Sequence, residues 1–244
     1  MDSGFYAACA GFRAQSQALE VAAHNLANLN TTGFRGQQTT FQSLVASARP
    51  TLANVLNVAT NNFGVLEGTH LDLKSGSLQA TGNPLDVGIE GSGFFAVQTA
   101  QGTRYTRNGN FRVSRAGELT TANGDPVLGD NGVIRVPAGA VSVSSDGTIS
   151  VNSAVAGKIK LVDFAPGAKL VSEGNAMVSA PSESVQPAQS VSVRQGTLES
   201  SNVNAIDGVM MLMTVQREAE MMQRALTLFH TEFNRIAAND LPHV

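Results

Sequence analysis

Apolar residues recur at helical spacing in two segments, one near each end of the 244-residue chain. In the first segment the positions lie three, four or seven residues apart, and only Gln15 interrupts them. In the second segment steps of three and four alternate without interruption, which is the a/d pattern of a heptad repeat. The pattern predicts two terminal helices that bury these residues in a coiled coil or against neighbouring subunits. The N-terminal seam consists of Phe5, Ala8, Phe12, Leu19, Ala22, Leu26 and Leu29, and the C-terminal seam of Leu212, Val215, Ala219, Met222, Leu226, Phe229, Phe233 and Ile236.

Between the seams the apolar period changes to two, which is typical of β-strands. Short alternating runs from residue 71 to about residue 198 are separated by turn-forming pairs such as Asn108-Gly109. The pair Asp146-Gly147 predicts a two-residue hairpin turn. We therefore expect an α+β fold with an inserted all-β domain. The expected parts are a discontinuous helical coiled-coil domain of residues 1–35 and 200–244, an extended connection over 36–70, and the β-rich domain over 71–199.

Methionines extend the apolar surface of the second predicted helix beyond its seam. Five of the seven methionines lie between residues 210 and 222. Methionine side chains are flexible and adapt to irregular contacts. This concentration favours a helix that is contacted on several sides. The five residues are Met210, Met211, Met213, Met221 and Met222.

The composition favours a folded protein and argues against several classes of function. Hydrophobic residues make up 42% of the chain, charged residues only 14%, and the net charge is −3, so no basic field for nucleic acid exists. The single cysteine, Cys9, excludes an intramolecular disulfide. No apolar run is long enough to span a bilayer. The first residues lack a basic region and an apolar run, so we expect no cleaved secretory signal.

Residue patterns for catalysis or metal binding are missing, which predicts a protein without enzymatic activity, cofactor or small-molecule substrate. No P-loop or Gly-x-Ser-x-Gly motif occurs. No histidine has metal-ligand spacing to a cysteine, an aspartate or another histidine; the four are His24, His70, His230 and His243. Four closely spaced arginines are interpreted as charges along a strand face, because no aromatic platform adjoins them. These are Arg104, Arg107, Arg112 and Arg115.

Four segments, in order along the chain, carry a resemblance to a known family. Residues 22–35, AAHNLANLNTTGFR, closely resemble the N-terminal signature of bacterial flagellar rod and hook proteins, with His24 where asparagine is usual. Residues 82–95, 105–111 and 196–204 are similar to the family's central strand motif, its next hairpin and the lead-in to its C-terminal helix. The signature residues matched are Asn25, Leu26, Ala27, Asn28, Thr31, Gly33 and Phe34.

The resemblance implies a structural subunit of the flagellar basal-body rod, the hollow drive shaft that joins motor to hook. The length of the chain fits a rod protein better than the longer hook protein. The first residues of the chain are more similar to the proximal-rod branch of the family than to the distal-rod branch. The implied partners are copies of itself and other rod proteins in a helical filament, together with the flagellar type III export apparatus. The implied location is the periplasm-spanning rod of the basal body. The terminal helices would form the family's inner domain and the β region its outer domain.

Two other functions remain open from the residues alone. One is an envelope protein whose β domain binds or hydrolyses carbohydrate; such a protein needs convergent carboxylates or aromatic platforms, and only 5% of residues are aromatic. The other is a closed coiled-coil oligomer with a β insertion, which would never form a filament.

Overall fold

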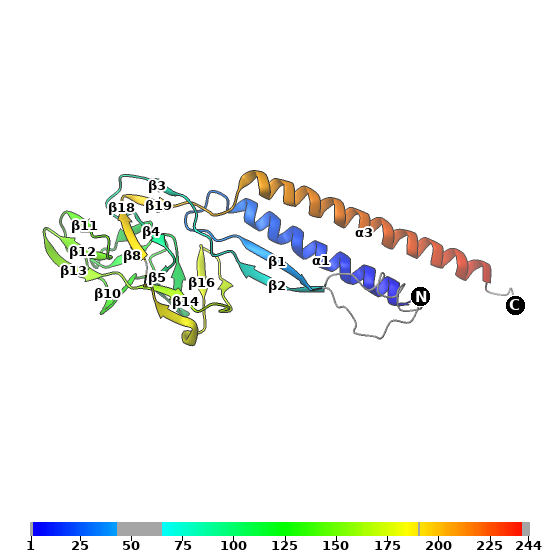
Figure 1. The fold of residues 1–244 in the computed structure, drawn as a ribbon, viewed down its shortest axis with the longest axis horizontal. Coiled ribbons are helices and arrows are strands. Elements are labelled where there is room, and N and C mark those ends of the chain that lie inside the picture. Colours follow the sequence, from blue (N-terminus) through cyan, green and yellow to red (C-terminus); the bar gives the residue numbers. More distant parts are fainter. Residues whose placement is uncertain (1, 43–64, 190, 241–244) are drawn as a thin grey trace. The chain divides into compact units, whose positions relative to one another are not determined.

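A computed structural model describes residues 2–42, 65–189 and 191–240, and these fall into two compact units. The helical unit contains the described parts of residues 1–26, 37–69 and 204–244. The β unit contains residues 27–36 and 70–203. Figure 1 shows the two long helices and the strands that give the units these names.

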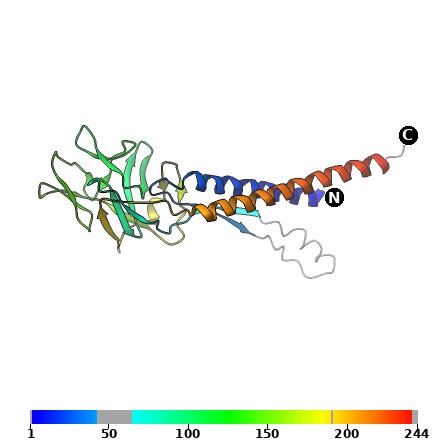
Figure 2. The ribbon, with the colours of Figure 1, turned by 90° about the horizontal axis from the view of Figure 1, so that it is seen from above.

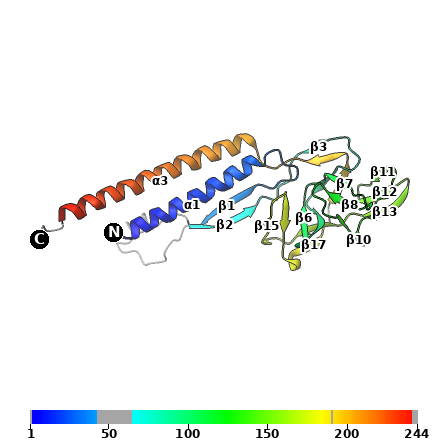
Figure 3. The same ribbon diagram turned by 180° about the vertical axis from the view of Figure 1, so that it is seen from behind.

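The helical unit is built on two helices, α1 (Asp2–Ala27) and α3 (Ala205–Asp240). They lie side by side and run in opposite directions (Figures 1, 2 and 3). Gln15, the polar interruption of the N-terminal seam, donates a hydrogen bond of 2.8 Å from Nε2 to Oε2 of Glu218 on α3. Asn204 caps α3, since its Oδ1 accepts the backbone N–H of Ile206 at 2.9 Å. The two helices are found as expected, whereas their coiled-coil geometry stays a prediction.

A two-stranded sheet of β1 (Gln37–Gln42) and β2 (Val65–Leu71) occupies part of the expected connection over residues 36–70. Residues 43–64 of that connection lie outside the described residues. The structure also divides the chain differently from the expected layout at residue 35. Residues 27–36 belong to the β unit, because the backbone and side chains of this segment bond to residues of that unit.

The described residues of the β unit form six sheets of short strands, and their strand pairs are antiparallel. The largest has six strands in the order β15-β16-β6-β5-β14-β17. Its strands are β5 (Phe94–Thr99), β6 (Gly102–Thr106), β14 (Leu161–Phe164), β15 (Val171–Ser172), β16 (Met177–Ser179) and β17 (Val185–Pro187), with the short 3-10 helix η1 (Ser182–Ser184) before β17. The smaller sheets pair β3 (Leu78–Ala80) with β19 (Thr197–Glu199), β4 (Val87–Gly91) with β18 (Val191–Gln195), β7 (Phe111–Val113) with β8 (Leu119–Thr121), β9 (Leu128–Gly129) with β10 (Gly132–Val133), and β11 (Val141–Val143) with β12 (Thr148–Val151) and β13 (Ala154–Lys158).

Strand β5 is buried on both faces, which explains its continuous apolar run. Phe95 and Val97 belong to one hydrophobic cluster, and Phe94 and Ala96 belong to a second one. Successive side chains of a strand point to opposite faces, so four apolar residues in a row serve two cores. The Phe95 ring also packs edge-on against Phe111, with ring centroids 5.0 Å apart. The expected all-β middle region therefore has a closed core of its own.

The hairpin between β11 and β12 differs from the two-residue turn predicted at Asp146-Gly147. The N–H of Ser144 donates to the carbonyl of Thr148 at 2.9 Å, so the loop holds three residues between this pair. Gly147 has φ +84°, the left-handed conformation that such a loop requires at its last position. The prediction of a hairpin was right and that of its loop length was wrong, because the closing pair depends on strand register.

Candidate functional site

The C-terminal seam lies along the partly covered face of α3. Val215 is buried, and Leu212, Ala219, Met222 and Leu226 are half-buried. The side chains of Phe229, Phe233 and Ile236 lie outside the described residues. The role of this seam in contacts between subunits stays a prediction.

The large side chains of the N-terminal seam are less buried than the helical pattern predicts. Phe12, Leu19 and Leu26 on α1 are half-buried, as is Leu29 in the β unit, while the side chain of Phe5 lies outside the described residues. Among the side chains of α1 that the structure describes, the buried ones are instead small residues spaced three or four apart. These residues are Gly11, Ala14, Ala18 and Ala22, of which only Ala22 belongs to the seam. Small side chains let a neighbouring backbone approach closely, so the large side chains of the seam remain available for other contacts.

Much of the apolar surface of α3 is exposed to solvent. Met221 is 62% exposed and Met213 is 53% exposed, and neighbouring apolar residues are exposed to a similar degree. An exposed apolar patch of this kind is typical of an interaction surface. We call this set the exposed face of α3; it consists of Ile206, Val209, Met210, Met211, Met213, Met221 and Leu228.

Within the family signature, Asn25 fixes the start of β1 against α1. Its Nδ2 donates to the carbonyl of Gln37, and its Oδ1 accepts the N–H of Gln37, both at 2.8 Å. The side-chain amide thus makes the same pair of bonds as a neighbouring backbone would. This pairing explains why an asparagine suits the position.

The rest of the signature is a tight turn that packs into the β unit. Asn28 accepts the N–H and the hydroxyl of Thr31, both at 3.1 Å, and Ala27 before it is exposed. Gly33 has φ +68°, and a Cβ at this position would lie 2.3 Å from the backbone nitrogen of Asn108. Only glycine allows both this conformation and this approach. The buried Phe34 follows, so the turn delivers residues 34–36 into the interior.

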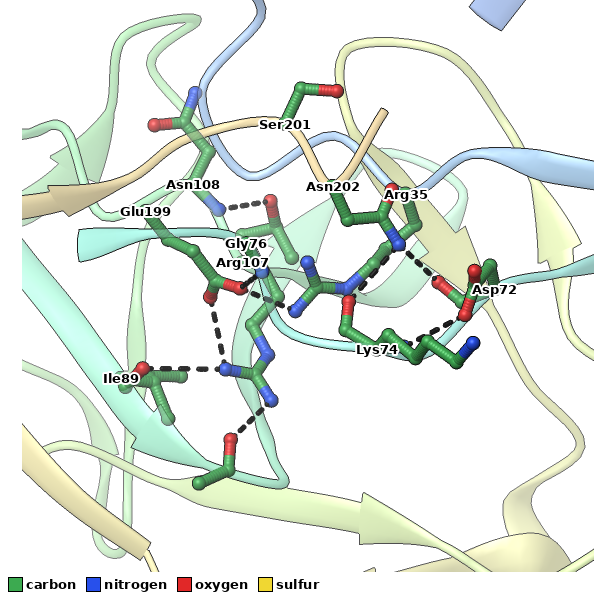
Figure 4. Close-up of polar contacts among 12 residues, drawn as sticks. Arg35, Asp72, Lys74, Gly76, Ile89, Arg107, Asn108, Glu199, Ser201 and Asn202 are labelled. Atoms are coloured by element: carbon green, nitrogen blue, oxygen red, sulfur yellow. Dashed lines mark hydrogen bonds and ion pairs between the residues drawn. The ribbon is translucent and has the colours of Figure 1, made fainter. Parts of the chain in front are cut away.

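Arg35, Arg107 and Glu199 form a buried charge cluster in the interior of the β unit (Figure 4). Nη2 of Arg35 donates to Oε1 of Glu199 at 2.7 Å, and Nη1 of Arg107 donates to Oε2 at 3.0 Å. Arg35 is 3% exposed, and the other two residues are 1% exposed. One carboxylate therefore binds two guanidinium groups from segments 164 and 92 residues away in the sequence.

Burial lowers the pKa of Arg107 to about 10, while the carboxylate of Glu199 acts in the opposite direction. The side chain therefore keeps its charge at neutral pH. Nη2 of Arg107 also donates to the carbonyl of Gly91 at 2.7 Å, and the guanidinium carbon lies 5.2 Å from the ring centroid of Phe94. These contacts support a buried cation that water cannot reach.

Asn202 binds two backbone segments beside this cluster, through three hydrogen bonds (Figure 4). Its Oδ1 accepts the N–H of Gly36 at 2.8 Å, and its Nδ2 donates to the carbonyls of Asp72 at 2.9 Å and Lys74 at 3.0 Å. The N–H of Gly76 donates to Oε1 of Glu199 at 2.7 Å. The lead-in to α3 thus holds both neighbouring chain segments through two side chains.

Asp86 is a second buried carboxylate, and it organises the central strand motif. It accepts hydrogen bonds from the hydroxyl of Thr81 at 2.7 Å and from the side-chain amides of Asn83 and Asn110, both at 3.0 Å. Asn110 comes from the second hairpin motif, residues 105–111. The backbone of Gly196 donates to the carbonyl of Asp86 at 2.8 Å. The segments that carry the resemblance therefore meet in the β unit.

The four arginines expected along one strand face have different environments. Arg104 pairs with Glu173, Arg112 and Arg115 are exposed, and Arg107 is buried against Glu199. The interpretation as charges along a strand face is wrong for Arg107, which lies in the interior. Nothing in local spacing distinguishes Arg107, and the one signal for it was its place inside a family motif. Glu199 and Asn202 were likewise visible only as part of the lead-in motif.

The described residues offer little for catalysis or for binding of a carbohydrate. No group of three His, Cys, Asp or Glu among them could hold a metal ion. A groove of about 390 Å³ in the β unit is lined by no aromatic ring, and its one carboxylate, Glu199, is already bound to two arginines. None of the helices in the described part is both long and apolar enough to cross a membrane.

Comparison with known proteins identifies the family. The family model for flagella basal body rod proteins matches residues 5–35, and that for the flagellar hook protein FlgE/F/G D1 domain matches residues 88–151. The chain is 34% identical to the flagellar basal-body rod protein FlgF of Mesorhizobium japonicum over 90% of both sequences, and 32% identical to that of Escherichia coli over 93% of this chain and 94% of the relative. It is 31% identical to the rod protein FlgG of Bacillus subtilis over 91% and 93% of the two sequences. The chain therefore belongs to the family of bacterial flagellar basal-body rod proteins, and within it is most like FlgF, with FlgG next.

Proposed function

We propose that this chain is a structural subunit of the flagellar basal-body rod and joins copies of itself and other rod proteins in a helical filament that transmits torque from motor to hook. Family membership supports the role. The single structural observation that carries the assembly mechanism is the exposed face of α3, which leaves seven large apolar side chains uncovered in one subunit.

The free energy for assembly comes from burying this surface against neighbouring helices. Fully burying one methionine or leucine side chain contributes about 1.5–3 kcal/mol. Several such residues per subunit are enough to offset part of the entropy lost on association. Contacts between different faces of successive subunits, with a rotation that does not close, produce a filament instead of a ring. The two seams and the exposed face of α3 would together supply these faces.

The other parts of the proposal follow from the family. The subunit works mechanically, without a catalytic step, cofactor or substrate. It leaves the cytoplasm through the flagellar type III export apparatus, without a cleaved signal peptide, and resides in the periplasm-spanning rod of the basal body. The helical unit would form the inner part of the shaft and the β unit the outer part.

Lysine substitutions on α3 test the assembly surface. Met213→Lys and Met221→Lys each place a charge on the exposed face, whereas Gln223→Lys introduces the same charge at an exposed polar position of the same helix. We expect the two methionine variants to lose swimming in soft agar and to be absent from purified basal bodies, and the Gln223 variant to retain both. Normal motility of the methionine variants would contradict the proposed surface.

The seam is tested separately with Leu226→Asp on its half-buried face. An unpaired charge in a packed seam costs several kcal/mol, so we expect no rod to assemble. Circular dichroism of the purified variant checks that the helices are retained. Motility at the wild-type level would remove Leu226 from the assembly seam, and purification of the parent protein as a closed oligomer would favour the coiled-coil alternative.

A further inference from the structure

We propose that the β unit folds only as a closed clamp: its core is completed when Glu199 and Asn202, which lie late in the chain, bind the segment around Arg35. The clamp is defined by Arg35, Arg107, Glu199 and Asn202. It is a conformational device that makes folding of residues 70–195 conditional on the lead-in to α3. The inference concerns one subunit and does not depend on the proposed function.

Two buried arginines share one acidic partner, Glu199. Arg35 and Arg107 are almost completely buried, and the same carboxylate, that of Glu199, pairs with both. Without Glu199, two guanidinium groups would lie close together in a protein interior with no counterion bound to either side chain among the described residues. Removing one partner of a buried ion pair is strongly destabilising, because the other charge remains desolvated. A chain that lacks residue 199 in place would therefore have to bury two guanidinium groups without a bound counterion, which disfavours closing the core around both.

Arg35 depends on Glu199 more than Arg107 does. Among the described residues, the hydrogen bond from Arg35 Nη2 to Glu199 is the only side-chain bond that this guanidinium makes, and its Nε and Nη1 have no acceptor. Arg107 keeps the carbonyls of Gly91 and Ile89 as further acceptors. Without Glu199, the Arg35 guanidinium would keep no acceptor among the described residues, whereas Arg107 would keep two backbone carbonyls.

Glu199 and Asn202 also accept hydrogen bonds from backbone N–H groups of earlier parts of the chain. The N–H of Gly33 donates to the carbonyl of Glu199 at 2.7 Å, that of Gly36 to Asn202, and that of Gly76 to the carboxylate of Glu199. Strand β19, which contains Glu199, also pairs with β3. The lead-in thus supplies acceptors to two separate segments, one at Gly33 and Gly36 and one at Gly76, and these hydrogen bonds form only once the lead-in is in place.

The order in which the chain emerges matters when the N-terminus comes first, as it does during synthesis. Arg35 and Arg107 emerge 164 and 92 residues before their common partner. Until residue 199 follows, the β unit holds two cations that its core cannot accept. The subunit would therefore remain incompletely folded until its C-terminal region is free.

Native-state hydrogen exchange on the full chain tests the clamp directly. We expect the amides of Gly33, Gly36 and Gly76 to exchange with the same opening free energy as the core amides of Ala96 and Val127. Equal values would show that the clamp and the core open together. Exchange of the three glycines at a lower free energy, with Ala96 and Val127 still protected, would overturn the proposal.

Charge substitutions provide the second test. Glu199→Gln keeps the shape and removes the charge, and we expect it to raise the unfolding equilibrium constant at least about 100-fold. The matched control is Glu90→Gln, which removes a carboxylate whose pair with Arg194 is more than half exposed, and it should change this constant less than about fivefold. A Glu199→Gln chain as stable as the parent would overturn the proposal.

A double variant keeps the test informative if Glu199→Gln does not fold. Arg35→Met in the Glu199→Gln background removes one of the two unpaired charges, so we expect it to restore a cooperative unfolding transition. In the parent background the same Arg35→Met change should destabilise. Additive effects of the two substitutions would show that the residues do not act as one clamp, and the proposal would fail.

Discussion

The β unit and α3 of the helical unit differ in how far they bury their apolar side chains. The β unit buries aromatic and aliphatic residues in two clusters and pairs its buried arginines with Glu199 inside one subunit. On α3 of the helical unit, Val215 is buried while most methionines are exposed. The β unit therefore carries its own stability, whereas α3 presents apolar surface that a neighbouring molecule can cover.

Under the proposed function, the β unit would make the subunit a stable building block, and α3 would supply the surface for assembly. Substitutions in the β unit should change the free energy of unfolding of the subunit itself. Substitutions on the exposed face of α3 should leave the subunit stable and change only its association. The following experiments separate the two effects.

The largest effect on stability is expected at Phe95 in the β unit. Its side chain is fully buried and packs edge-on against Phe111. Phe95→Ala should lower the free energy of unfolding by about 3–5 kcal/mol, because it removes buried surface and leaves a cavity. Urea denaturation followed by circular dichroism measures this loss. Val155→Ala, at an exposed strand position, serves as control, and a loss below about 1 kcal/mol at Phe95 would break the comparison.

The second effect is steric and concerns Gly109 in the hairpin motif. A Cβ at this position would lie 1.7 Å from the carbonyl oxygen of Val87 and 2.8 Å from its carbon. Gly109→Ala should therefore lower the free energy of unfolding by about 1–3 kcal/mol as the backbone moves apart. In Gly157→Ala the nearest atom, in Ile134, lies at an ordinary 3.4 Å, so this control should unfold like the parent in the same urea titration. Equal behaviour of both variants would argue against a tight backbone approach.

A third prediction concerns the exposed face of α3 in the isolated subunit. Met221→Lys should change the free energy of unfolding by no more than about 0.5 kcal/mol, since the side chain is largely in water. Thermal denaturation of the purified monomer measures this, and soft-agar motility of the same variant measures assembly. A stable subunit without motility would sharpen the contrast between the units, whereas a loss above about 1 kcal/mol would mean that Met221 packs within the subunit.

The smallest effect is expected at the surface pair of Arg104 and Glu173 in the β unit. The hydrogen bond from Arg104 lowers the pKa of Glu173 below its ordinary value of 4.5. Because folding lowers this pKa, its contribution to stability is present above pH 4.5 and is lost as the pH falls through the folded value. Glu173→Gln should therefore flatten slightly the dependence of the thermal midpoint on pH below about 4.5.

Glu183→Gln is the control for this titration, since Glu183 is an exposed carboxylate that makes no ion pair among the described residues. A pH dependence of the Glu173 variant identical to that of the parent would show that the pair is too well solvated to matter.

Local patterns predicted the elements of the fold well but not their pairing. The period of two along residues 71–198 predicted strands, and the seams predicted α1 and α3. The order of the central sheet, with β16 beside β6 and β14 beside β5, has no local signal because it depends on segments far apart in the sequence. The placement of residues 27–36 in the β unit was missed for the same reason, since it depends on bonds to Glu199 and Asn202.

The assembly residues were predicted from periodicity alone, and the structure adds a distinction within them. On α1 the spacing selected large residues such as Phe12 and Leu19, whereas the buried positions are Ala14 and Ala18. Helical spacing identifies an apolar stripe but cannot say which side of it a neighbouring element covers. Their role between subunits remains a prediction that the substitutions on α3 and at Leu226 address.

Residue patterns alone predict the two helices, the β-rich middle and, through the motifs, the family. These features depend on residues within a few positions of each other, and such local spacing is readable without a structure. No residue pattern indicates that Arg107, among four similar arginines, is buried, or that Glu199 binds it together with Arg35; both follow from the fold. A buried charge needs a counterion close to it, and the fold brings that counterion to Arg107 from a segment 92 residues away in the sequence.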